Sequence, residues 1–161
     1  METSNTEPKD IINFHSKLAA AGGFVMVPVL DFAAVGGVQV RMIMKLAEHY
    51  GVALSEKKMK TVISTLVAGL MPKSLASGVV GSLVKAVPVV GHFASAFTLP
   101  VLAATSTKIL GNIFAGHFSE GGTLLDIDKE QLKKMFGAEM EKAEAAEAEK
   151  KAPAKTKKSA A

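Results

Sequence analysis

The chain has 161 residues, a net charge of +4 and no cysteine, so disulfides and thiolate metal sites are excluded. With eight Phe, one Tyr and no Trp, it offers few aromatic platforms on which nucleic-acid bases could stack. Of its 19 basic and 15 acidic side chains, 5 fall in residues 1–17, 12 in residues 18–125 and 17 in residues 126–161. The central segment is therefore only about a tenth charged, where about a quarter is usual in a soluble domain, and this predicts a membrane-associated protein.

The same distribution predicts four parts: a polar N-terminal segment (1–17), an apolar helical core domain (18–125), a polar C-terminal helix (126–152) and a disordered basic tail (153–161). The first ten residues carry three acidic side chains and one lysine, so they lack the basic start of a secretory signal. We expect the N-terminus to stay in the cytosol.

The first helix predicted in the core domain follows a bend at residues 27–31. Pro28 removes a backbone donor and disfavours helical conformation at the residue before it, and Asp31 is expected to act as the N-cap of the next helix. There are two alternatives for Asp31. It could form a buried ion pair with Arg41 or Lys85, or it could take part in ion or proton movement. The helix should be amphipathic and end at Gly51. Its predicted apolar side carries Val40, Ile43, Met44, Ala47 and Tyr50, and its polar side Arg41, Lys45, Glu48 and His49.

A second amphipathic helix is predicted between Ser55 and Pro72. Residues 86–107 then form an uncharged run of 22 residues, which is long enough to cross a bilayer, but Pro88, Gly91 and Pro100 interrupt it. We therefore expect a helix over 75–86, a bend, and a helix over 92–116 that is kinked at Pro100. The bends at Pro28 and Pro88, with glycines at 51 and 111, suggest a weak internal repeat of two Pro-turned helical hairpins.

Small side chains recur at every fourth position of the last core helix, at Ala103, Thr107, Gly111 and Ala115. Such a smooth face lets two helix backbones approach closely in lipid. Packing between helices of one chain is the preferred interpretation, and a seam between copies is the alternative.

Asp128 and Gln131 predict the capped start of a polar helix. Beyond it, five lysines are candidates for contact with anionic lipid head groups or a protein partner: Lys150, Lys151, Lys155, Lys157 and Lys158. Tails of this composition are most often merely solvated. A specific nucleic-acid site is not expected, because an acidic helix adjoins the lysines.

The chain contains no phosphate-binding loop, no paired histidines at metal-ligand spacing and no nucleophile elbow. We therefore do not expect an enzyme, a cofactor or a metal site.

Between about Gly22 and Gly122 the order and spacing of certain residues resemble a bacterial domain family of unknown function, which occurs in YcjF-type inner-membrane proteins and attached to some Era-like GTPases. The matching positions are Pro28, Asp31, Gln39, Met42, Ile43, Tyr50, Gly51, Lys85, Pro88, Gly91, Thr105, Gly111, Phe118, Gly121 and Gly122. The resemblance implies a helical, membrane-associated module. This chain carries no GTPase motifs, so a GTPase would have to be a separate partner.

These observations predict an all-α, compact bundle of Pro-turned helical hairpins at the bacterial inner membrane, with both termini facing the cytosol. The expected partners are membrane lipids, further copies of the chain and a separate GTPase. The leading hypothesis is a non-enzymatic scaffold or accessory protein that inserts helical hairpins, self-associates and recruits a partner. The alternatives are a soluble helical adaptor that regulates a GTPase, and a pore or ion pathway that uses Asp31, Lys85 and Lys108.

Overall fold

The computed structural model describes residues 6–22, 28–52, 57, 60, 61, 63–65 and 99–151. These residues contain four complete helices, α1 (Pro8–Gly22), α2 (Pro28–His49), α7 (Leu99–Ser119) and α8 (Lys129–Lys151), and no strand. The predicted all-α fold is confirmed. The predicted helix over 75–86, the bend with Pro88 and Gly91, and the tail beyond Lys151 lie outside the described residues.

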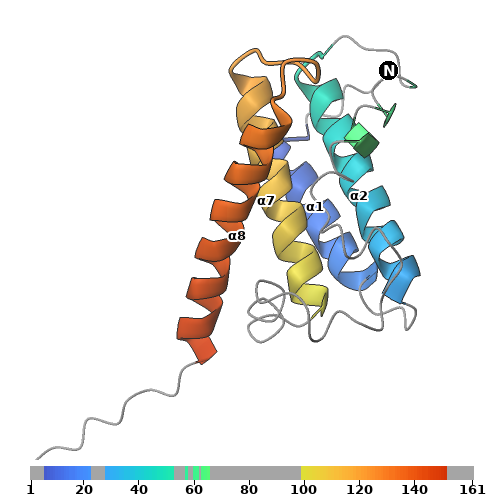
Figure 1. Ribbon diagram of the computed structural model, residues 1–161. Coiled ribbons are helices and arrows are strands. Elements are labelled where there is room, and N and C mark those ends of the chain that lie inside the picture. Colours follow the sequence, from blue (N-terminus) through green and yellow to red (C-terminus); the bar gives the residue numbers. More distant parts are fainter. Residues whose placement is uncertain are drawn as a thin grey trace, which may run out of the picture.

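Three of the helices form one packed unit, and the fourth lies against its side (Figure 1). α2 and α7 run parallel to each other, and α1 lies behind them in the opposite direction, in contact with both. α8 returns antiparallel along α7. Within the described chain, α7 is therefore the central helix, since it contacts each of the other three.

α1 is the element that the sequence analysis did not predict. Ile11, Ile12, His15 and Ala19 recur at helical spacing, and all four are buried. The isoleucines belong to the main hydrophobic cluster, which they share with side chains of α2 and α7. The division of the chain into four parts stays a prediction, but the boundary proposed after residue 17 falls inside this helix.

The hydrophobic core lies where α1, α2 and α7 meet, and side chains of α8 and of the 57–65 segment close it. Its largest buried apolar side chains, each less than 2% exposed, are Phe114, Met42, Ile43, Leu46, Ile63 and Leu110. Burying one such side chain stabilises a fold by about 1.5–3 kcal/mol. Ile63, from the second predicted amphipathic helix, shows that this segment contributes to the same core.

α2 departs from its prediction at its first turn. The helix begins at Pro28, so Asp31 lies within it and is not its N-cap. A proline suits the first position of a helix, because the backbone N–H that it lacks would have no intrahelical partner there. The polar side was predicted correctly, with Arg41, Lys45, Glu48 and His49 all exposed. The predicted apolar side also faces the core, and it is wider than expected, because Met42 and Leu46 are fully buried as well.

Glycines end both α2 and α7 in the same way. Gly51 has φ +69° and Gly121 has φ +84°, a conformation that glycine adopts at little cost. After α2, Val52 N donates to the Ala47 carbonyl (2.8 Å) and Gly51 N to the Glu48 carbonyl (3.2 Å), which is the Schellman arrangement. The predicted stop at Gly51 is confirmed. Gly111, in contrast, lies inside α7, so the proposed equivalence of Gly51 and Gly111 in an internal repeat is wrong.

Replacing Gly51 by alanine is expected to lower the free energy of unfolding by about 1 kcal/mol, because an L side chain is strained at positive φ. Gly37→Ala in the middle of α2 is the matched control. Neither glycine has an atom within 4 Å of where a Cβ would stand. The control should gain about 0.5–1 kcal/mol from helix propensity, and urea titration of both variants measures the difference. Effects of the same sign would contradict the assignment of Gly51 as a left-handed cap.

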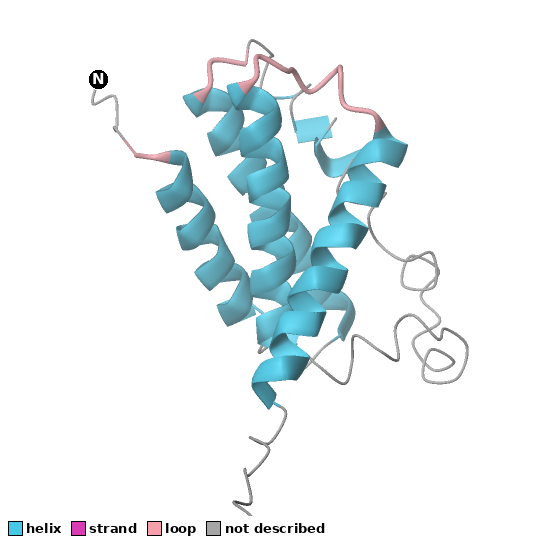
Figure 2. Cartoon of the chain, turned by 90° about the vertical axis from the view of Figure 1, so that its left-hand side faces the viewer, coloured by secondary structure: helices cyan, strands magenta, loops and turns pink. Residues whose placement is uncertain are grey.

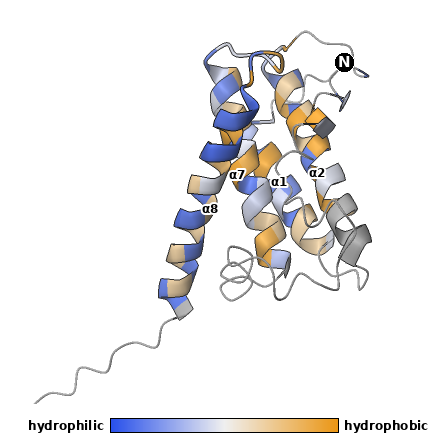
Figure 3. Ribbon diagram, in the orientation of Figure 1, coloured by the Kyte–Doolittle hydropathy of each residue, from blue (hydrophilic) through white to orange (hydrophobic). Residues whose placement is uncertain are grey.

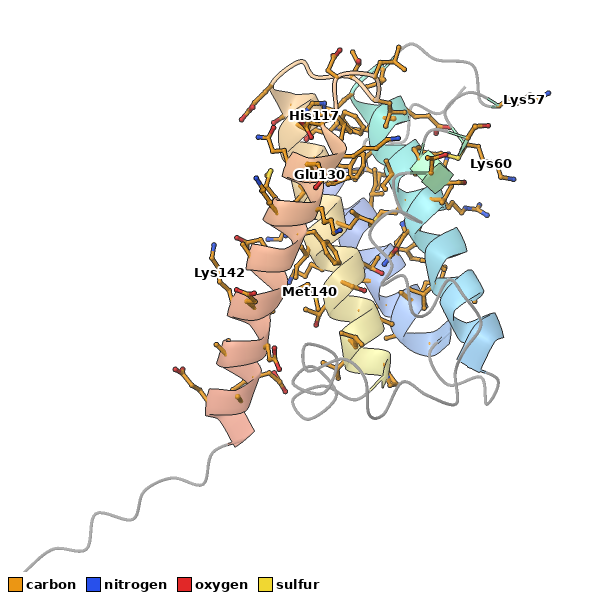
Figure 4. The ribbon with its side chains drawn as sticks, in the orientation of Figure 1. Lys57, Lys60, His117, Glu130, Met140 and Lys142 are labelled. Atoms are coloured by element: carbon orange, nitrogen blue, oxygen red, sulfur yellow. The ribbon has the colours of Figure 1, made fainter. Side chains whose placement is uncertain are left out.

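A hydrogen-bonded turn reverses the chain between α7 and α8. His117 Nε2 lies 2.8 Å from the carbonyl oxygen of Thr123, while the Thr123 hydroxyl donates to Asp126 Oδ2 (2.8 Å). Asp128 Oδ1 then accepts hydrogen bonds from the backbone N–H groups of Glu130 (2.7 Å) and Gln131 (3.1 Å), which confirms Asp128 as the predicted cap of α8. Figure 4 shows His117 and Glu130 at this end of the molecule.

α8 docks on α7 through a narrow apolar strip of Leu132, Phe136 and Met140. Met140 packs against Leu102 and Ile109 of α7, and Figure 4 marks its position on α8. The rest of α8 consists mainly of charged residues and alanines, and Figure 3 shows it as the most hydrophilic of the described helices. It therefore belongs to the fold through one face only.

None of the described helices combines the length and the apolar composition that a membrane crossing requires. α7 begins at Leu99 and has Pro100 as its second residue. The helix predicted over 92–116 is therefore described only from Leu99 onward, with Pro100 in its first turn, and residues 86–98 of the uncharged run lie outside the described part of the chain.

Candidate functional site

A polar contact joins α2 to α7 inside the core. Gln39 Nε2 lies 3.2 Å from Thr107 Oγ1 and 3.4 Å from Ser106 Oγ. Gln39 is only 7% exposed and Thr107 is fully buried, and the Ser106 hydroxyl also donates to the Ala103 carbonyl (3.1 Å). A buried amide is costly unless it finds partners, so this contact favours one register of α2 along α7.

One turn further along α7, Gly111 lies close to side chains of both α1 and α2. A Cβ added to Gly111 would stand 2.8 Å from Ile12 Cγ1 of α1 and 3.0 Å from Met42 Sδ of α2. Ala103 is 8% exposed, and Ala115 packs at the edge of the same core. Thr107 and Gly111 of the predicted small-residue face thus pack against α1 and α2 of the same chain.

The residues carried by the family resemblance fall into three groups. Gln39, Met42 and Gly111 meet at the crossing of α2 and α7. Pro28 and Gly51 mark the start and the stop of α2. Of the others, Asp31 lies in α2, Thr105 is half-buried on α7, and Lys85, Pro88 and Gly91 lie outside the described residues.

A second feature lies on the outer surface, where α1 and α7 are side by side. An open groove of about 450 Å³ is lined by Pro8, Lys9, Ile12, Asn13, Lys108, Asn112 and Ala115. Elsewhere on α1, Phe14 and Leu18 are 63% and 43% exposed, and Lys17 is also exposed. Large apolar side chains and lysines therefore share the solvent side of α1.

The lysines predicted to contact lipid or a partner lie at or beyond the end of α8. Lys150 is exposed, and its Nζ is 3.6 Å from Glu147 Oε2. Lys151 is the last residue of α8, while Lys155, Lys157 and Lys158 lie outside the described residues. Exposed ion pairs of this kind contribute little to stability.

Two buried polar side chains of α1 were also missed by the sequence analysis. His15 Nδ1 lies 2.7 Å from the Ile11 carbonyl oxygen, while His15 Nε2 and Ser16 Oγ have no hydrogen-bond partner among the described residues. No group of three His, Asp or Glu side chains in the described ranges is placed to hold a metal ion. The helical spacing of Ile11, Ile12 and His15 was the available signal for burying this face.

The chain is similar to a known protein family and to one named protein. A family model described as "Domain of unknown function (DUF697)" matches residues 1–145. The chain is 33% identical over 144 residues to "Magnetosome membrane protein 22" of Magnetospirillum gryphiswaldense, an alignment that covers 89% of this chain and 74% of the relative. No solved structure matches. The resemblance to a bacterial domain family of unknown function is confirmed, and the chain belongs to the DUF697 family.

Proposed function

We propose that this protein is a non-enzymatic, membrane-associated scaffold or accessory protein of the bacterial inner membrane. The observation that carries the proposal is its similarity, over 89% of its length, to a protein named as a magnetosome membrane protein. The sparse charge of residues 18–125 supports the same conclusion, because few ionisable side chains would have to be taken out of water.

In this proposal the helices have separate tasks. Apolar helical hairpins of the core domain insert into the bilayer, and the unit of α1, α2 and α7 holds them in a fixed arrangement. α8 carries a polar surface and the terminal lysines, which recruit a cytosolic partner such as a separate GTPase. Self-association of the chain would gather several such surfaces at one place on the membrane.

Membrane fractionation of the full chain, with an epitope at its C-terminus, tests the proposal. The chain should sediment with membranes, resist a carbonate wash if hairpins insert, and expose its tail to protease only in inverted vesicles. A tail that is cleaved in intact spheroplasts would contradict the cytosolic orientation. Recovery in the high-speed supernatant, together with a cytosolic marker enzyme, would contradict membrane association and favour the soluble adaptor.

A further inference from the structure

We infer that the outer face of α1 and the adjoining α1–α7 groove form a docking surface for an anionic lipid bilayer. The inference rests on the proposed membrane association and assigns it to a defined surface. We call this surface the α1 lipid face, and its residues are Lys9, Phe14, Lys17, Leu18 and Lys108.

The apolar part of the α1 lipid face is a short ridge along α1. Phe14 and Leu18 are four residues apart and therefore lie on one side of the helix, one turn from each other. Both are large apolar side chains left exposed, whereas the apolar side chains of Ile11, Ile12 and Ala19 in the same helix are buried. Figure 2 shows α1 at the edge of the bundle, with no described helix on its outer side.

The basic part consists of two lysines in the groove and of Lys17 on the exposed side of α1. Lys9 and Lys108 line the groove together with Asn13 and Asn112, and none of the described residues that line it is acidic. Within the described structure, none of Lys9, Lys17 and Lys108 takes part in an ion pair. Together, α1 and α7 contain four charged residues, which are three lysines and one aspartate. α8, in contrast, carries equal numbers of acidic and basic side chains.

This combination suits a lipid surface better than a second protein. Phe14 and Leu18 together expose roughly 200 Å², whereas a stable protein interface needs about 800 Å² from each partner. A helix lying in the bilayer interface needs only a few apolar side chains at the acyl boundary, with lysines at the level of the phosphates. Phe14 and Leu18 would supply the apolar side chains, and Lys9, Lys17 and Lys108 would supply the lysines.

The absence of tryptophan from the chain makes a site-specific test possible. In the full chain, Phe14→Trp places a single tryptophan on the α1 lipid face, and Met135→Trp places one on α8 at a position that is 44% exposed. Both are mixed with vesicles of phosphatidylcholine and phosphatidylglycerol in which a fraction of the lipid is brominated. We expect the emission at position 14 to shift to the blue and to be quenched at least twofold, and the emission at position 135 to remain unchanged.

Sedimentation of the same samples separates the two proposals. Chains that sediment with the vesicles while position 14 is not quenched would overturn the α1 lipid face and leave the proposed function standing. Chains that do not bind vesicles at all would overturn both. A blue shift at position 14 that depends on protein concentration and needs no lipid would assign the surface to a second copy, which also overturns the inference.

A charge variant tests the basic half of the surface. In the Phe14→Trp chain, changing Lys9, Lys17 and Lys108 to glutamine should raise several-fold the amount of anionic lipid needed for half-maximal quenching. The matched control changes Lys129, Lys133 and Lys134 of α8 to glutamine and removes the same charge from another helix. An equal lipid requirement for both variants would overturn the assignment of the lysines. Circular dichroism confirms that each variant retains its helices.

Discussion

Replacing Gly111 by leucine is expected to lower the free energy of unfolding by about 3 kcal/mol, because overpacking a tight contact displaces its neighbours. A Cβ at position 111 would already lie 2.8 Å from Ile12 Cγ1. Ile12 cannot easily rotate away, because it is β-branched and a β-branched side chain in a helix has little rotational freedom. Urea unfolding, followed by helical circular dichroism, measures the loss.

Gly116→Leu on the same helix is the matched control, since nothing lies within 4 Å of its Cβ position. The control should be neutral or gain up to about 1 kcal/mol from helix propensity. Adding Ile12→Ala to Gly111→Leu should recover part of the loss, and a double-mutant cycle gives the coupling between the two sites. Equal losses for Gly111→Leu and Gly116→Leu would show that α1 does not pack against α7 at this point.

Truncating Phe114 to alanine is expected to cost about 3–5 kcal/mol, the range for a buried aromatic side chain in a core. Phe114 is 1% exposed, belongs to the main cluster and has its ring centroid 5.7 Å from that of Phe118. The loss should appear as a lower midpoint of urea unfolding with an unchanged slope.

Phe14→Ala makes the same chemical change on the surface, where the side chain is 63% exposed. Its effect should stay within about 0.5 kcal/mol, as is usual for surface positions. If Phe14→Ala cost as much as Phe114→Ala, the outer face of α1 would be covered in the folded chain. That result would also remove the basis for a lipid-facing α1.

The elements that sequence predicts well here are those with local signals. The stop of α2 follows from Gly51, which adopts positive φ, and the start of α8 follows from the capping side chain of Asp128. The polar side of α2 follows from helical periodicity. Each of these signals lies within a few residues of the feature that it specifies.

The features that were missed depend on contacts far apart in the sequence. α1 carries three charged and several polar side chains, so its sequence predicts a solvated segment. Its burial depends on contacts such as that between Ile12 and α7, which local sequence does not specify. The candidate site was predicted as a set of family residues, but the pairing of Gln39 with Thr107 joins positions 68 residues apart. Periodicity within α2 or within α7 could not set that register.

The same limit applies to the outer surface. In the sequence, Lys108 lies in the sparsely charged segment 18–125, and Lys9 and Lys17 belong to the predicted polar N-terminal segment. Only the packing of α1 against α7 brings Lys9 and Lys108 to one groove. The charge pattern of the surface is therefore a property of the tertiary fold.

The single-sided attachment of α8 has a mechanical consequence. The helix has 23 residues, about 35 Å of continuous α-helix. Its apolar anchors, Leu132, Phe136 and Met140, all lie within its first twelve residues. The rest of the helix extends beyond them as a continuous arm (Figure 1). A molecule bound at the far end would be held at a fixed distance from the bundle, and force applied there would act as a lever on three side chains.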